Sequence, residues 1–308
     1  EAKRTAMQLR HQLADRDYQE VVNYSFVDAA WENDFYANDA AIVLANPIAS
    51  QMGVMRSGLI GGLVGTLSAN LKRHTRRVRV FEVGRCFMRD AAAQPVAGFQ
   101  QPLRVAALCA GPAVPDQWGM ETRNVDFFDL KADVESLFPP HALRFEKLAH
   151  PALHPGRAAS IVLDDKTIGL IGELHPQWVQ KYELANLGNL APVVCEIELE
   201  SLASQPLPRY REVSRYPSVV RDLALLVAHD QPLQALLDAL RAAAPAIVND
   251  IELFDVYQGK GIEKNQKSLA FHIVMQDTEK TLADNEADMA IQQLIDIAVK
   301  QFAAALRT

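Results

Sequence analysis

The order of helix and strand patterns in the last hundred residues most constrains what this chain can fold into. Period-2 and period-3.6 apolar spacing predicts, in chain order, a strand, a helix, two strands and a long helix: Arg221–Ala228, Leu233–Ala243, Ile247–Tyr257, Ser268–Met275 and Asp284–Leu306. The long helix begins with Asp284 as its expected N-cap, and its expected buried stripe consists of Met289, Leu294, Ile297, Ala298, Phe302 and Leu306. This order, with room for a short terminal strand, is typical of a ferredoxin-like βαββαβ domain.

The first two hundred residues mix helix and strand periods without the regular βαβ alternation of a parallel sheet. The strongest helix pattern runs from about Arg56 to Arg73, where leucines repeat every four residues in one apolar stripe. Strands are predicted at Val78–Met88, Leu103–Ala110, Ala158–Leu163, Thr167–Glu173 and Val193–Leu199. We therefore predict an α+β fold, in which an antiparallel sheet is flanked by helices.

The length of 308 residues favours two domains. Ser201–Arg211 contains Ser, Gln and two prolines, which is the composition of an exposed linker. We predict a core domain over residues 1–200, a linker over 201–213 and a second domain over 214–308. Because the chain begins with Glu rather than Met, we expect it to be a fragment of a longer protein.

Charge and cysteine content exclude several classes of protein. A net charge of −7 argues against binding nucleic acid by bulk electrostatics. Residues 209–308 contain 11 Lys and Arg against 14 Asp and Glu, so any RNA recognition there must rest on local stacking and hydrogen bonds. The three cysteines lie far apart, which predicts neither disulfides nor a zinc site and fits a reducing cytoplasm. No apolar run reaches the roughly 18 residues that span a bilayer.

Short motifs in a fixed order run along nearly the whole chain. They are Asn46–Ser50, Met55–Ile60, Phe81–Arg85, Phe128–Lys131, Arg215–Pro217, Arg221–Leu223, Leu253–Gly259, Lys267–Phe271 and Thr281–Leu282. In these motifs the chain resembles the C-terminal part of the β subunit of bacterial phenylalanyl-tRNA synthetase. The resemblance implies a class II aminoacyl-tRNA synthetase-like antiparallel core followed by a ferredoxin-fold anticodon-binding domain.

The core lacks the charges that a class II active site needs. Such a site uses two arginines to stabilise the transition state of adenylation. The first matching strand has Glu82 where arginine is required, and the later Gly169–Pro176 junction ends with Glu173 and His175. We therefore predict that this chain contributes no catalytic residues.

Strand alternation places two candidate recognition residues on one face of the second domain. In Leu253–Tyr257, alternation puts Leu253, Asp255 and Tyr257 on one face and Phe254 and Val256 on the opposite, core-facing side. A tyrosine can stack on a base, and a carboxylate can accept from a guanine edge.

The resemblance also implies specific contacts and partners. It adds Ser268 and Arg307 to Asp255 and Tyr257 as contacts to the anticodon of tRNA-Phe. It implies assembly with an α subunit as (αβ)₂, with Asn46–Arg73 as the candidate interface element. The apolar stripe of leucines in this element can equally pack on the chain's own sheet. ATP and Mg²⁺ would serve the whole enzyme, with no cofactor or metal bound by this fragment.

Two alternatives remain open: a regulatory or scaffold paralogue that binds no tRNA, and a free-standing class II-like synthetase. Four glycines between residues 58 and 65 faintly suggest a phosphate loop, but close helix packing explains them better. His150, His154 and His175 lack the spacing of a metal site.

Overall fold

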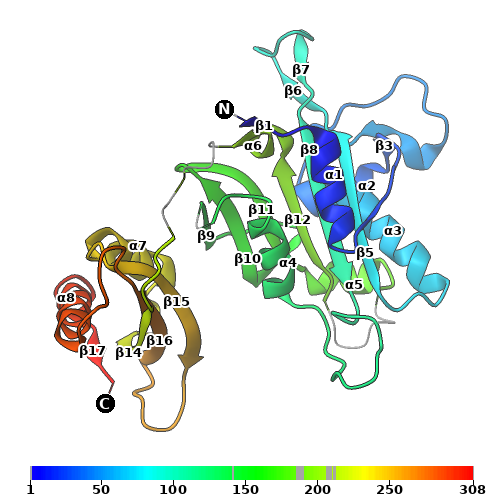
Figure 1. The fold of residues 1–308 in the computed structure, drawn as a ribbon. Coiled ribbons are helices and arrows are strands. Elements are labelled where there is room, and N and C mark those ends of the chain that lie inside the picture. The colour runs from blue at the N-terminus through cyan, green and yellow to red at the C-terminus, as the bar shows by residue number, and fades with distance from the viewer. Residues whose placement is uncertain (1, 141, 185–190, 206–209, 211–212, 308) are drawn as a thin grey trace. The chain divides into compact units, whose positions relative to one another are not determined.

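The computed structural model describes residues 2–140, 142–184, 191–205, 210 and 213–307. The chain divides into two compact units, Glu1–Leu207 and Pro208–Thr308 (Figure 1). Helices and strands are mixed in both units, as the sequence predicts for an α+β chain.

A seven-stranded sheet forms the centre of the first unit. Its strands, from edge to edge, are β2 (Gln19–Glu20), β5 (Val78–Arg85), β8 (Leu103–Ala110), β12 (Val193–Glu198), β11 (Lys166–Leu174), β10 (Leu153–Leu163) and β9 (Leu143–Lys147). All neighbours pair antiparallel except β2 and β5. The β10–β11 hairpin turns at Asp164 and Asp165, both with positive φ, a conformation that Asp tolerates better than most residues.

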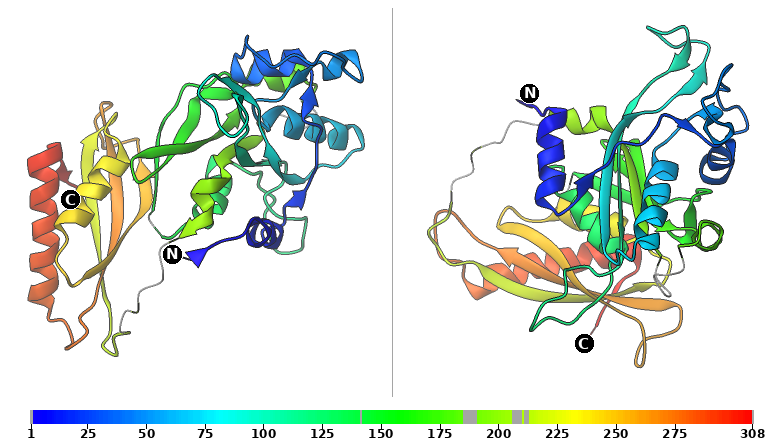
Figure 2. Two further views of the ribbon diagram at one scale, coloured as in Figure 1. Left: turned by 90° about the horizontal axis from the view of Figure 1, so that it is seen from above. Right: turned by 90° about the vertical axis from the view of Figure 1, so that its right-hand side faces the viewer.

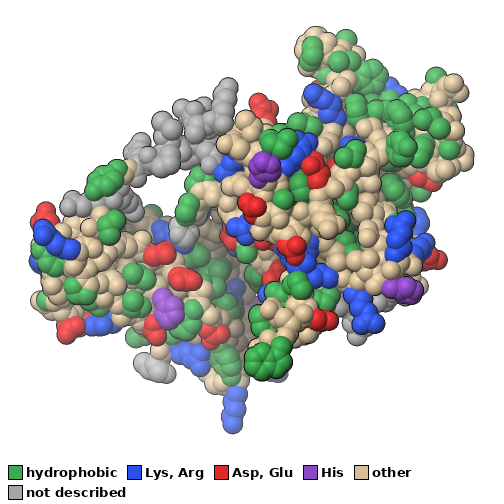
Figure 3. All heavy atoms as spheres, turned by 45° about the vertical axis from the view of Figure 1, so that its right-hand side comes forward, with side chains coloured by type: hydrophobic (Ala, Val, Ile, Leu, Met, Phe, Trp, Pro, Cys, Tyr) green, Lys and Arg blue, Asp and Glu red, His purple; other side chains and the backbone are tan. Residues whose placement is uncertain are grey.

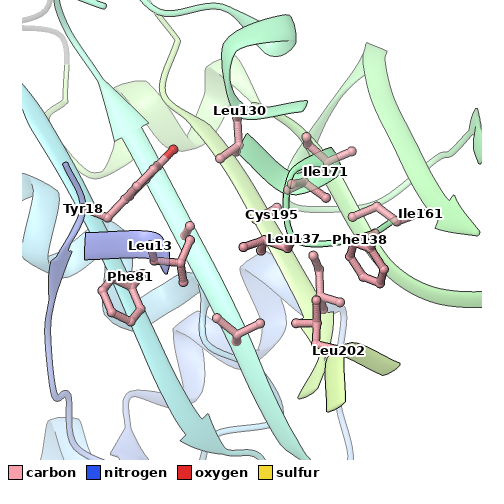
Figure 4. Close-up of a cluster of buried hydrophobic side chains, with 14 of the residues drawn as sticks. Leu13, Tyr18, Phe81, Leu130, Leu137, Phe138, Ile161, Ile171, Cys195 and Leu202 are labelled. Atoms are coloured by element: carbon pink, nitrogen blue, oxygen red, sulfur yellow. The ribbon is translucent and has the colours of Figure 1, made fainter. Parts of the chain in front are cut away.

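Helices cover both faces of this sheet (Figures 1 and 2). The helices α1 (Ala6–Asp15), α4 (Phe127–Glu135) and α6 (Leu199–Ala203) pack on one face, where Figure 4 shows part of the buried cluster. The helices α2 (Ala29–Tyr36), α3 (Ile60–Lys72) and α5 (Pro176–Lys181) pack on the other. Successive residues of β8 alternate between the two cores, so both faces of the strand are apolar.

Glycines let α2 and α3 approach each other closely. A Cβ on Gly61 would lie 2.7 Å from Cε3 of Trp31, and one on Gly65 would lie 3.0 Å from Cη2 of the same ring. A Cβ on Gly58 would lie 2.0 Å from the hydroxyl of Tyr36. Helix packing therefore explains these glycines, as predicted, and no phosphate loop is needed.

Three small two-stranded sheets and a 3₁₀ turn complete the first unit. The pairs are β1 (Ala2–Lys3) with β13 (Ser204–Gln205), β3 (Phe26–Val27) with β4 (Val54–Met55), and β6 (Met88–Asp90) with β7 (Gly98–Gln100), and the turn is η1 (Ser50–Met52). The expected linker, residues 201–213, thus begins within this unit, where Leu202 is buried and β13 pairs with β1. Residues 206–209 and 211–212 of that linker lie outside the described residues.

The second unit has the strand order of a ferredoxin-like domain. Its elements are β14 (Val219–Ala228), α7 (Leu233–Ala243), β15 (Val248–Tyr257), β16 (Gln266–Met275), α8 (Asp284–Phe302) and β17 (Ala305–Leu306). The sheet order is β15-β16-β14-β17, with all pairs antiparallel. Both helices lie on one face and bury a core that includes Leu236, Phe271 and Leu294 (Figure 2).

The last helix differs from its prediction at both ends. Its N-cap is Ala283 rather than Asp284, and the backbone N–H of Ala283 donates to the carboxylate of Glu286 at 3.0 Å. It ends at Phe302 because Ala303 adopts a left-handed conformation, with φ of 50°, and the chain then forms β17. Met289, expected in the buried stripe, is exposed. Among the described residues, no helix is long and apolar enough to cross a membrane.

Candidate functional site

The face of the second sheet that carries no helix presents a defined set of side chains. Antiparallel partners point to the same side of a sheet. Ser268, Ala270 and His272 of β16 point to this side, opposite to the core residues of that strand, although Ser268 is itself buried, with 1% of its surface exposed. Their partners on β15 are Tyr257, Asp255 and Glu252, and those on β14 are Leu226, Ala224 and Asp222. The open face thus contains three short rows of residues that run across the strands.

A β-bulge in β15 corrects the predicted alternation. The register with β16 shifts between Leu253 and Asp255, so that Phe254 has no direct partner. Leu253 packs against the helix-covered core, whereas Phe254 is 48% exposed and stacks on His272. The prediction that Leu253 shares a face with Asp255, and that Phe254 is a core residue, is wrong. Asp255 and Tyr257 do lie on one face, but Phe254 joins them there.

Three of the four predicted anticodon contacts meet at one end of the open face. The guanidinium of Arg307 lies 5.0 Å from the centroid of the Tyr257 ring and donates from Nη1 to Oγ of Ser268 at 3.2 Å. The backbone N–H of Arg307 donates to the carbonyl of Ala224 at 2.9 Å, which ties the residue to β14. Tyr257 donates from its hydroxyl to the carbonyl of Lys260 at 3.2 Å. The ring and the cation are therefore held in place by the fold.

Asp255, the fourth predicted contact, lies on the next row of the same face. It is exposed and pairs in register with Ala270, whose β14 partner is Ala224. The short side chains of the two alanines leave the sheet surface low beside the Asp255 carboxylate.

An aromatic pair, which sequence reasoning did not find, occupies the third row, that of His272. The rings of Phe254 and His272 are stacked, with centroids 3.9 Å apart and planes inclined by 11°. Nδ1 of His272 lies 2.7 Å from a carboxylate oxygen of Asp222. Regular alternation hides this pair, because only the bulge brings Phe254 to the open face.

The first unit contains a buried polar centre on the face of its sheet that α3 covers. Glu82 of β5 and Glu196 of β12 flank Ala106 of β8, and both glutamates are almost fully buried. Nη1 of Arg56 donates to Glu82 at 2.6 Å. The position that would require an arginine in a class II site is therefore occupied by a carboxylate whose charge is already neutralised by a buried guanidinium.

The second glutamate is also fully engaged. Glu196 accepts from Arg104, from the hydroxyl of Tyr36 at 2.9 Å and from the backbone N–H of Leu59 at 2.6 Å. Burial, with the neighbouring Glu196 charge, raises the pKa of Tyr36. Burial lowers the pKa of His150, which lines the same cavity of about 510 Å³. Of the two arginines that line this cavity, Arg89 and Arg104, the latter is already paired with Glu196.

The other sequence features of the core have structural roles. Glu173 forms an ion pair with Arg157 at 2.8 Å, and Nδ1 of His175 caps α5 by accepting from the N–H of Gln177. Within the described residues, no group of His, Cys, Asp and Glu is placed to hold a metal ion. The three cysteines are buried, and burial raises the pKa of Cys109 and of Cys195 to about 12.

Comparison with known proteins assigns both units. Residues 214–307 match the ferredoxin-fold anticodon binding domain, which defines the second unit as a member of that class of domains. Residues 1–199 match the phenylalanyl tRNA synthetase beta chain CLM domain. The chain belongs to the family of phenylalanyl-tRNA synthetase β chains.

Curated relatives agree with this assignment. The chain is 57% identical over 307 residues to the phenylalanine–tRNA ligase β subunit of Aromatoleum aromaticum, and 56% identical over 310 residues to that of Dechloromonas aromatica. Each alignment covers 100% of this chain but 38% of the relative. The chain therefore spans less than half the length of these relatives.

One solved structure has a weak similarity to this chain. A pyrrolysyl-tRNA synthetase from Desulfitobacterium hafniense aligns with 14% identity and a TM-score of 0.44, over 65% of this chain and 68% of that one. A similarity of this size does not establish a shared fold.

Proposed function

We propose that this chain is the non-catalytic part of a phenylalanine–tRNA ligase β subunit that recognises the anticodon of tRNA-Phe while a separate α subunit performs ATP-dependent charging. The observation that carries this proposal is the meeting of Tyr257 and Arg307 on the open face of a domain of the anticodon-binding class, with Arg307 bonded to the buried Ser268. Asp255 completes the set on the neighbouring row.

Each of these residues supplies a distinct interaction. The Tyr257 ring offers a stacking surface that accepts any base, whereas the Asp255 carboxylate selects a base edge that donates hydrogen bonds. Arg307 brings a positive charge to a domain with few of them, and it lies over the ring where a nucleotide phosphate can meet it. Since residues 209–308 are net acidic, most of the tRNA affinity of the enzyme must arise outside this domain.

The first unit fits a class II synthetase-like core that has lost catalysis. Its antiparallel sheet is appropriate for such a core, and Glu82 and Glu196 occupy the centre of one face with their own arginine partners. ATP and Mg²⁺ would then be used by the α subunit in the cytoplasm. We propose that residues 1–200 act as the scaffold, with 201–213 as the connection to an anticodon-binding domain over 214–308.

The surface around Asn46–Arg73 supports a partner interface. Tyr24, Val43 and Ile48 are 67–78% exposed, and a cavity of about 460 Å³ lies between α3 and the segment around β3. Figure 3 shows exposed hydrophobic side chains among charged ones on one face of the molecule. Of the three exposed residues, Tyr24 lines the cavity. Exposed apolar residues are typical of protein interfaces, and we assign this surface to the α subunit in an (αβ)₂ assembly.

Substitution of Tyr257 in the assembled enzyme tests the anticodon proposal. Tyr257→Ala should lower kcat/KM for tRNA-Phe by about tenfold or more, since loss of a base–aromatic stack costs about 1–3 kcal/mol. Tyr257→Phe keeps the ring and should stay close to the wild-type value. Unchanged charging by Tyr257→Ala would favour the paralogue that binds no tRNA.

The scaffold proposal has its own test. The purified chain alone should show no phenylalanine-dependent exchange between ATP and pyrophosphate, whereas the enzyme assembled with its α subunit should show it. Exchange by the chain alone would revive the free-standing synthetase.

A further inference from the structure

The Phe254–His272 pair has the properties of a ligand-facing surface rather than of a core contact. Phe254 is 48% exposed, and the side chain of His272 is 39% exposed. Two stacked rings on an open sheet face present a flat apolar area to solvent. The bulge that places Phe254 there interrupts the β15–β16 ladder and turns a large apolar side chain away from the core.

This pair is too far from Tyr257 to contact the same base. His272 lies four residues from Ser268 along β16, and Ser268 is the register partner of Tyr257. At roughly 3.3 Å per residue, His272 and Ser268 are about 13 Å apart along β16. Phe254 and Tyr257, three residues apart, are about 10 Å apart along β15. Ala224 and Ala270 lie between the rows of Ser268 and His272, with the exposed Asp255 beside Ala270 on the neighbouring strand.

The charges around the pair favour a base over a phosphate. Asp222 and Glu252 are the register partners of His272 on the two neighbouring strands. A carboxylate oxygen of Asp222 lies within hydrogen-bond distance of Nδ1 of His272, at 2.7 Å. Carboxylates at both sides repel the phosphodiester backbone. A nucleobase has no such penalty, and it gains from stacking on an aromatic ring.

We infer that Phe254, with its ring supported by His272, is a second stacking site for an unpaired RNA base, distinct from the base held at Tyr257. This inference rests on the proposed anticodon recognition and extends it to a further nucleotide of the same loop. The open face would then hold two unpaired bases, one on the Tyr257 ring and one on the Phe254 ring, which lie three residues apart along β15.

The test combines protein variants with tRNA that lacks single bases. Charging of tRNA-Phe by the assembled enzyme is measured for Phe254→Ala, Phe254→Tyr, Tyr257→Ala and Val256→Ala. Each variant is assayed with intact tRNA and with tRNAs that carry one abasic nucleotide at each anticodon-loop position in turn. Val256 is the matched control, because it is 50% exposed on the same strand but faces the helix-covered side in register with Leu269.

The inference predicts a specific pattern. Phe254→Ala lowers kcat/KM by about tenfold, in the range for a lost base stack, while Phe254→Tyr and Val256→Ala keep the wild-type value. The loss caused by Phe254→Ala disappears for one abasic position, and that position differs from the one that abolishes the effect of Tyr257→Ala.

The other outcomes separate this inference from the function on which it rests. Loss with Tyr257→Ala but not with Phe254→Ala refutes the second stacking site and leaves anticodon recognition standing. Loss with Phe254→Ala that persists for every abasic tRNA assigns Phe254 a purely structural role and also refutes the inference. No loss with either alanine variant overturns the proposed function together with the inference.

Discussion

Removing Arg56 should destabilise the first unit strongly. Its side chain and that of Glu82 are 5% and 3% exposed, and they form an ion pair of 2.6 Å. Arg56 also donates from Nε to the carbonyl of Arg85 at 3.0 Å. Arg56→Met would leave the Glu82 charge buried, with Asn23 as its remaining donor among the described residues. Breaking a buried pair from one side costs about 3–5 kcal/mol.

Tryptophan fluorescence measures this effect in one unit of the chain. All three tryptophans of the sequence, Trp31, Trp118 and Trp178, lie in the first unit. A loss of 3–5 kcal/mol in a domain of about two hundred residues lowers Tm by roughly 6–20 °C. Urea unfolding followed by the same tryptophan fluorescence provides the free energy of unfolding directly.

Two further variants make the experiment decisive. Lys72→Met breaks the exposed Lys72–Glu183 pair and should cost less than about 1 kcal/mol. The double variant Arg56→Met with Glu82→Met should recover most of the loss, because replacing both charges by apolar groups removes the unpaired carboxylate. If Arg56→Met costs no more than Lys72→Met, the buried pair is not the source of stability that its geometry indicates.

Other consequences concern packing and thiol chemistry. Gly61→Ala should destabilise the first unit by about 1–3 kcal/mol despite the better helix propensity of alanine, because its Cβ would meet the Trp31 ring at 2.7 Å. Urea unfolding measures this change. Stabilisation by about 1 kcal/mol would show that Trp31 moves aside freely. A thiol reagent at pH 8 should not label Cys86, Cys109 or Cys195 in the native chain, because burial raises their pKa values and keeps them protonated. All three should react in denaturant. Rapid labelling of any one in the native chain would contradict its burial.

The elements with strong apolar periodicity could be predicted from the sequence, and those built around buried charges could not. Leu103–Ala110 and Leu233–Ala243 coincide with their predictions. Helix α2 was missed because Glu32 and Asp34 interrupt its apolar pattern. Both carboxylates are buried in the structure and accept hydrogen bonds from distant residues.

The candidate site shows the same limit. Tyr257 and Asp255 could be placed on one face by alternation, and the motif added Ser268 and Arg307. Nothing in the local sequence marks the bulge at Phe254, because a bulge depends on pairing with β16. The Arg104–Glu196 pair likewise joins residues 92 positions apart.

The bulge also bears on how such a surface can change over evolutionary time. Phe254 is the residue that the register shift between Leu253 and Asp255 leaves without a partner. Deletion of its codon would leave Asp255, Val256 and Tyr257 paired with the same residues as now. An extra aromatic ring can therefore be inserted into or lost from this surface in a single genetic step, without changing the register of the remaining sheet. The surface can change in size while its original recognition residues stay in place.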